Sequence, residues 1–259
     1  MWSTIKTEAL VISSEPWKEA DRRYRALTPA HGKLEFVGRG AMKGKAKLAA
    51  HLEPFAVVKL EIIKGRSSTT VIGVERLEAF KTLATVIESR LLALAAVALI
   101  DKTVRPDLED QFLYSEALEL LRFLDTAPAF APTRNTLVLG GFLLRLLRHL
   151  GYDVELGTCL ACKDDIRPLA FRWHEGRGGL VCTNCVLEQP QEWFAARALD
   201  EEIVTLLRFA RDARYLDLLK PSLRADHVGM FATCVHDLLR FHVPGYVDET
   251  PFWYTTTVT

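Results

Sequence analysis

The stretch Ile5-Lys6-Thr7-Glu8-Ala9-Leu10-Val11 places Ile5, Thr7, Ala9 and Val11 in alternation with the residues between them. Side chains of a β-strand point alternately to opposite faces, so this period of two predicts a strand. Four further short segments rich in β-branched and aromatic residues follow, at positions 24–26, 34–36, 58–62 and 69–73. Five short strands in the first 75 residues favour a small closed barrel of the OB type.

The segment 38–54 interrupts the strands with glycine, lysine and alanine, and residues 45–52 are expected to form one short helix. After Phe80 the spacing of apolar residues becomes that of helices. Two sets of residues would each lie on one face of a helix: Leu113, Ala117, Leu120 and Leu124 in the first, and Leu139, Leu143, Leu146 and Leu150 in the second. Pro132 marks a helix start and Gly151 a helix end, and Asp200 is placed to cap a later helix.

Two pairs of cysteines with two residues inside each pair stand in a segment rich in glycine and arginine: Cys159, Cys162, Cys182 and Cys185. Each pair can grip a metal ion from a tight turn, and four thiolates complete a tetrahedral zinc shell without an open position for water or substrate. The sequence therefore predicts one structural zinc ion. A site that includes His174 and a set of metal-free thiols are the alternatives, while Cys234 is expected to be a buried thiol on a helix.

These patterns predict an α+β chain with an N-terminal OB-fold β-barrel, followed by an α-helical domain with an inserted four-cysteine zinc module. The expected boundaries are 1–80 for the barrel, 81–156 and 190–245 for the helical domain, and 157–189 for the four-cysteine module. The tail 246–259 has no expected structure.

Charge and hydropathy narrow the class of protein. The chain has 33 lysines and arginines against 33 aspartates and glutamates, so a uniformly basic coat is excluded, although cations concentrate in the first 47 residues. The longest apolar run, 91–100, is about half of what a membrane-crossing helix needs. No secretory signal is visible, and a cytoplasmic protein with reduced cysteines is expected.

A basic loop, residues 38–47, carries Arg39, Lys43, Lys45 and Lys47. It does not have the spacing of a nucleotide-phosphate loop, and Ala46 stands where that loop needs serine or threonine, so nucleotide hydrolysis is rejected. Cations beside a barrel fit a groove that follows a nucleic-acid backbone, whereas an ordinary solvated loop explains the same composition. The candidate base-stacking residues fit the barrel core better: Trp17, Tyr24, Phe36 and Phe55.

A second cationic group, formed by Arg145, Arg148 and His149, lies beside the leucine face of a predicted helix. It could hold an acidic peptide with an aromatic end, or the arginines could simply cover a helical core. The sequence has no metalloprotease, nucleophile-elbow or dinucleotide signature, and the chain is not expected to be an enzyme.

In the order of these features the chain resembles the bacterial RecO recombination mediators, up to about His242. The similarity lies in three groups of residues: Glu19-Ala20-Asp21, Leu27-Thr28, Gly32-Lys33 and Arg39-Gly40-Ala41 in the barrel, 142–147 with Gly151-Tyr152 in the central helix, and the four cysteines with Gly178-Gly179. The sequence departs from the family pattern at four positions. Met42, Ala46, Val154 and Lys163 stand where arginine, serine, proline and glycine are usual.

This resemblance implies a protein that binds single- and double-stranded DNA, anneals complementary strands and helps load RecA onto strands covered by single-strand-binding protein. It implies RecR as a partner, a nucleoid-associated location, and a helical domain that recognises the acidic C-terminal tail of single-strand-binding protein. By position, Arg145 and Arg148 would bind that tail, and five cations would line the DNA path: Lys33, Arg39, Lys43, Lys45 and Lys47. The rival hypotheses are an RNA-binding zinc-ribbon/OB assembly factor, a zinc hydrolase and a protein adaptor.

Overall fold

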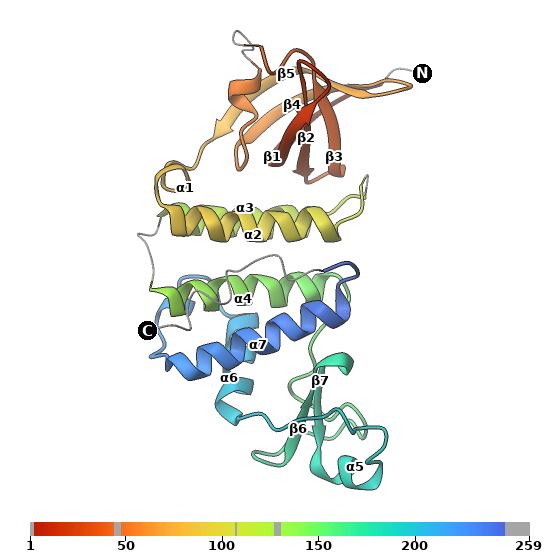
Figure 1. Ribbon diagram of the computed structural model, residues 1–259, viewed down its shortest axis with the longest axis vertical. Helices are drawn as coiled ribbons and strands as arrows, with labels where there is room; N and C mark the ends of the chain where they lie inside the picture. The colour runs from red at the N-terminus through yellow and green to blue at the C-terminus, as the bar shows by residue number, and fades with distance from the viewer. Residues whose placement is uncertain (1–2, 44–47, 107, 127–130, 247–259) are drawn as a thin grey trace. The chain divides into compact units, whose positions relative to one another are not determined.

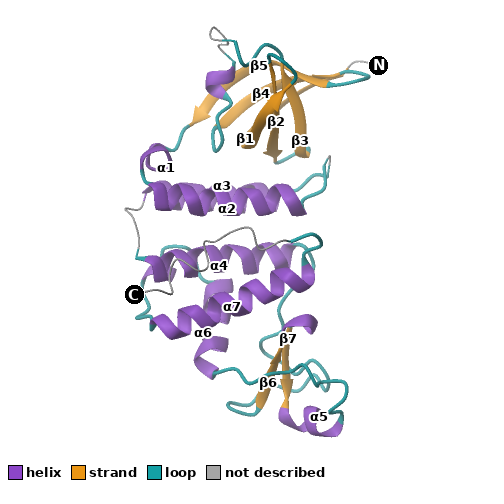
Figure 2. Ribbon diagram, in the orientation of Figure 1, coloured by secondary structure: helices purple, strands orange, loops and turns teal. Residues whose placement is uncertain are grey.

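A computed structural model describes residues 3–43, 48–106, 108–126 and 131–246 (Figure 1). The chain forms two compact units, Met1–Ala129 and Phe130–Thr259. The first contains a barrel and three helices, and the second contains the remaining helices and the four-cysteine module (Figure 2). The finer division expected from the sequence, with boundaries near residues 80, 156 and 189, stays a prediction.

The first unit begins with five strands that close into a barrel in the order β1-β2-β3-β5-β4, as the alternating sequence pattern predicted. The strands are β1 (Ser3–Trp17), β2 (Asp21–Thr28), β3 (Gly32–Gly38), β4 (Val57–Lys64) and β5 (Thr69–Glu78). Long antiparallel ladders join β1 to β2 and to β4, and β2 to β3. The parallel contact between β3 and β5 consists, in the described residues, of Val37 opposite Thr70. This topology is OB-like.

The barrel interior holds the apolar side chains of the alternating pattern. Tyr24 and Phe36 are buried and stack with their ring centroids 5.6 Å apart, and Phe55 is buried as well. Of the four candidate stacking aromatics, Trp17 alone keeps a large exposed fraction, 37%. In the region of the expected short helix, Ala49–His51 form a 3-10 helix (η1), while residues 44–47 lie outside the described part of the chain.

Three helices complete the first unit: α1 (Lys81–Thr85), α2 (Ile87–Thr103) and α3 (Gln111–Thr126). The hydroxyl of Tyr114 on α3 donates to the carboxylate of Glu8 on β1 at 2.6 Å, which ties α3 to the barrel. The chain between α2 and α3 crosses Gly32, whose φ is +60°, and a Cβ there would lie 1.8 Å from the carbonyl oxygen of Leu108. Only glycine fits this position.

In the second unit α4 (Pro132–His149) packs against α6 (Glu201–Asp212) and α7 (Ala225–His242). The predicted start of α4 at Pro132 is confirmed, and Gly151, with φ of +89°, follows its end. Asp200 is the N-cap residue of α6, as expected, but its side chain makes no capping hydrogen bond. Among the described residues, no helix has the length and apolar character needed to cross a membrane.

The four-cysteine module combines a two-stranded sheet, β6 (Phe171–His174) and β7 (Gly179–Cys182), with the short helix α5 (Thr183–Glu188). The 3-10 helix η2 (Glu175–Arg177) links the two strands. Gly178 has a φ of +68°, and a Cβ on Gly179 would lie 2.6 Å from the carbonyl oxygen of Glu155, which crosses β7 at this point. The glycine pair is therefore required by the turn and by the close approach of two backbones.

Candidate metal centre and nucleic-acid interface

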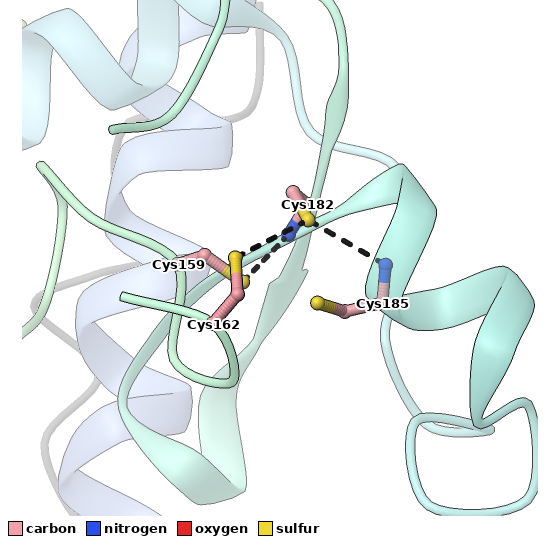
Figure 3. Close-up of side chains that lie close together, drawn as sticks. All are labelled: Cys159, Cys162, Cys182 and Cys185. Carbon is pink, nitrogen blue, oxygen red and sulfur yellow. Dashed lines mark hydrogen bonds between the residues drawn. The ribbon is translucent and has the colours of Figure 1, made fainter. Parts of the chain in front are cut away.

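The four cysteines converge in the second unit, as Figure 3 shows. One pair flanks the turn at residues 160–162, Cys182 ends β7, and Cys185 lies in α5. Their sulfur atoms all lie within 4.8 Å of one another, and the Sγ atoms of Cys162 and Cys182 are 3.9 Å apart. Four sulfurs at about 2.3 Å from a tetrahedral zinc ion are about 3.8 Å apart. The cluster can therefore hold a metal ion with little movement.

Backbone N–H groups point at the sulfurs. The Sγ of Cys159 accepts from the N–H groups of Ala161 at 3.4 Å and Cys182 at 3.2 Å, and the Sγ of Cys182 accepts from the N–H of Cys185 at 3.5 Å. Burial raises the pKa of the Cys159 thiol, but these and other backbone donors outweigh it and lower that pKa to about 6. The turns that carry the cysteines thus favour a thiolate at Cys159.

Not all four thiols can ionise together without a cation. Burial, followed by hydrogen bonding with the Cys182 thiol, raises the pKa of Cys185. A bound divalent ion supplies the positive charge that lets every sulfur lose its proton. The alternative ligand, His174, is otherwise engaged, because its Nδ1 accepts from the N–H of Arg177 at 3.2 Å. The four cysteines are therefore the candidate donor set, and Cys234 is buried on α7 outside it.

The described part of the basic loop is fixed to the turn between β1 and β2. The N–H of Gly40 donates to the Asp21 carboxylate at 2.8 Å, and the N–H of Met42 donates to the carbonyl of Ala20 at 2.9 Å. Arg39 is 57% exposed with one guanidinium nitrogen 3.2 Å from Asp21, and Lys43 is exposed. Lys45 and Lys47 lie outside the described residues.

The same end of the barrel carries the candidate stacking residue Trp17 and three cations that were not among the predicted site residues. Trp17, the last residue of β1, has the guanidinium of Arg23 4.3 Å from its ring centroid. Arg22 lies opposite Gly38 in the β2–β3 ladder, directly before the basic loop, and Lys18 is exposed in the β1–β2 turn. Only the strand register, which requires the folded barrel, shows that these residues neighbour the loop.

Lys33 points elsewhere. Its side chain is 11% exposed, and its Nζ lies 3.3 Å from the carboxylate of Asp101 at the end of α2. Arg25 on the neighbouring strand pairs with the same carboxylate. The cation of Lys33 is thus used to hold α2 against the barrel, and we leave it out of the candidate DNA surface.

Arg145 and Arg148 also make internal contacts. Arg145 donates to the carbonyls of Ala210, at 3.1 Å, and Ala213, at 3.3 Å, at the end of α6. Arg148 pairs with Asp212 at 2.5 Å and with Asp153 at 3.4 Å. Both arginines therefore connect α4 to α6, and Arg148 also contacts the chain after α4. Their role in binding a peptide stays a prediction.

Comparison with known proteins identifies the family. Residues 1–80 match the family model described as "Recombination protein O N terminal", and residues 85–229 match "Recombination protein O C terminal". The chain belongs to the recombination protein O (RecO) family. This confirms the resemblance found in the sequence.

Three bacterial relatives carry the name DNA repair protein RecO. The chain is 33% identical to the one from Roseiflexus sp. (strain RS-1), over 70% of this chain and 62% of the relative. It is 30% identical to the one from Cutibacterium acnes, over 70% of this chain and 74% of the relative. It is 28% identical to the one from Geobacter sulfurreducens, over 70% of this chain and 72% of the relative.

One strained position lies beside the four-cysteine cluster. Lys163 has a φ of +64°. A left-handed conformation costs a non-glycine residue about 1–2 kcal/mol, part of which glycine's larger unfolded-state entropy offsets. We expect Lys163→Gly to raise the free energy of unfolding by about 1 kcal/mol, or roughly 3 °C in melting temperature, measured by calorimetry. Lys163→Ala is the control, because alanine meets the same strain; equal stability of the two variants would contradict the explanation.

Proposed function

We propose that this chain is a DNA-binding recombination mediator that acts without a covalent step. It binds single- and double-stranded DNA, anneals complementary strands and helps load RecA onto single strands covered by single-strand-binding protein. Cations that neutralise phosphates allow two strands to approach each other. In this role the chain would act together with RecR and would recognise the acidic tail of single-strand-binding protein. It would be located in the cytoplasm, at the nucleoid.

One observation carries the DNA-binding part of this proposal. The exposed cations of Arg39 and Lys43 lie on a loop that is pinned beside the exposed Trp17 end of a closed OB-like barrel. Barrels of this type bind nucleic acid with cations that follow the backbone and with aromatic groups that stack on bases. Family membership supports the same role.

We further propose that the metal is a single zinc ion with a structural role. Four thiolates suit zinc and fill its tetrahedral shell, so no position is left for a reacting water. The ligands would be Cys159, Cys162, Cys182 and Cys185. The ion would fix the turn at residues 160–162 to β7 and α5.

The DNA surface is tested by replacing two cations. We expect Arg39→Ala/Lys43→Ala to lower the affinity for a single strand roughly tenfold and to reduce the slope of log K against log salt by about 1.4, because each phosphate contact contributes about 0.7. Strand annealing should slow in parallel. Fluorescence anisotropy at several salt concentrations measures both quantities.

A double variant elsewhere on the surface provides the control. Lys59→Ala/Lys163→Ala removes two exposed cations outside the proposed path and should bind DNA as the parent does. If the two double variants behave alike, the basic loop is not the DNA path. RNA of the same sequence should bind more weakly than DNA; tighter binding of RNA would favour an RNA assembly factor.

A further inference from the structure

A cavity of about 400 Å³ lies in the first unit where the end of the β3–β4 connection meets α1 and the start of α2. Phe55, Phe80 and Leu83 give it apolar walls. A volume of this size is within the range of small-molecule sites in proteins, and all its lining residues belong to the described part of one compact unit. Neither the metal centre nor the basic loop contributes to it.

The polar lining of the cavity is cationic. Arg76, Lys81 and Arg90 line it together with the exposed Glu53, whose carboxylate pairs with Arg76 at 3.8 Å, so two cations remain in excess. One terminal N–H group of Arg76 donates a hydrogen bond to the carbonyl of Ala50. The Nε of the same guanidinium is buried and has no hydrogen-bond partner among the described residues. A buried donor without a partner is costly. The guanidinium that carries it belongs to the cavity wall, where its charge favours an anionic ligand.

The backbone at the cavity wall is also held in an unusual conformation. Phe55 has a φ of +73°, which is rare for a residue with a bulky side chain, while its N–H donates to the carbonyl of Val11 at 2.8 Å. This hydrogen bond holds the backbone of Phe55 against β1, and Phe55 lines the cavity. Strained residues of this kind cluster at ligand clamps.

Together these features describe a ligand with an anionic group and a flat apolar part. We propose that the cavity binds one nucleotide of a DNA strand, with its phosphate near Arg76, Lys81 and Arg90 and its base against Phe55 and Phe80. This inference rests on the proposed DNA binding but is tested without a strand.

The test measures binding of thymidine 5′-monophosphate to the full-length chain by ligand-observed NMR, with thymidine and inorganic phosphate as separate probes. The variant is Lys81→Ala/Arg90→Ala, because Arg76 is needed to hold Ala50. We expect the double variant to bind the nucleotide about tenfold more weakly, because two charge-assisted contacts to the phosphate are lost. The parent should bind thymidine, which lacks the phosphate, and inorganic phosphate, which lacks the base, at least about tenfold more weakly than the nucleotide. Arg39→Ala/Lys43→Ala should leave nucleotide binding unchanged.

The outcomes separate this inference from the proposed function. Unchanged nucleotide binding in Lys81→Ala/Arg90→Ala overturns the site, even if strand binding depends on the basic loop. Equal binding of phosphate and nucleotide shows that the base has no part and overturns the assignment as well. A short aspartate peptide ending in phenylalanine that binds the cavity more tightly than the nucleotide makes it a peptide site. Nucleotide binding that depends on Lys81 and Arg90 supports the inference, even where the basic loop proves unimportant for strands.

Discussion

Removing the metal ion is expected to unfold the four-cysteine module while the first unit stays folded. The module's own core is small, consisting of Val181, Trp193 and two of the cysteines with a few half-buried neighbours. Segments shorter than about 40 residues rarely fold without a cross-link, and structural zinc supplies an apparent 10–16 kcal/mol, roughly, in zinc-finger peptides. Chelation or Cys185→Ser should therefore expose Trp173 and Trp193, both of which are buried in the folded chain.

Tryptophan emission, hydrogen exchange by mass spectrometry and the metal content per chain measure this effect. Emission should shift to longer wavelength, and exchange should rise within residues 157–189 and not in the barrel. Acid should have the same effect as the chelator, because protons compete with the metal for the thiolates. Cys234→Ala is the control and should keep one metal ion per chain. A Cys185→Ser chain with normal exchange in the module would show that the fold does not depend on the metal.

Replacing Asp101 with alanine is expected to lower the free energy of unfolding by about 2 kcal/mol, because removing one partner of a partly buried ion pair leaves the other charge uncompensated. Two cations depend on this carboxylate, Lys33 with 11% exposure and Arg25 with 26%. Arg25 keeps contacts to Glu15 and Glu35, so Lys33 is the group left without a charged partner.

Urea unfolding of the full chain measures the loss. Asp101→Asn should fall between the parent and Asp101→Ala, since the amide oxygen still accepts a hydrogen bond but carries no charge. Asp226→Ala, which breaks an exposed pair with Arg224, should leave the stability unchanged. If Asp101→Ala behaves like Asp226→Ala, the contact does not hold α2 to the barrel.

Local patterns in the sequence were enough to predict the strands, the ends of α4 and the convergence of the four cysteines. Each of these depends on residues close together in the chain, such as Pro132 and Gly151 at the two ends of one helix. The spacing of the cysteines also predicted which side chains would lie together, because two tight turns can meet at one point.

Contacts between distant residues could not be predicted in this way. Lys33 was assigned to the DNA path by position, but its partner Asp101 lies 68 residues away and belongs to another element. Similarly, the helical pattern predicts that Arg145 is a surface cation, whereas in the folded chain it donates to a carbonyl at the end of α6. The fate of a charged side chain depends on the tertiary fold, and no local period reveals it.

Strands β3 and β5 are joined by the pairing of Val37 with Thr70, so this seam of the barrel should open more easily than the others. The ladder between β1 and β4 has to break along eight residues, from Ser3 to Leu10, whereas the β3–β5 seam parts when one pairing is lost. Breathing of the barrel therefore concentrates at this seam. Residues 39–43 directly follow β3, so the proposed DNA-binding cations lie next to this seam, while Gly40 and Met42 hold their loop to the β1–β2 turn. Opening of the seam could therefore move β3 relative to β5 without releasing the loop.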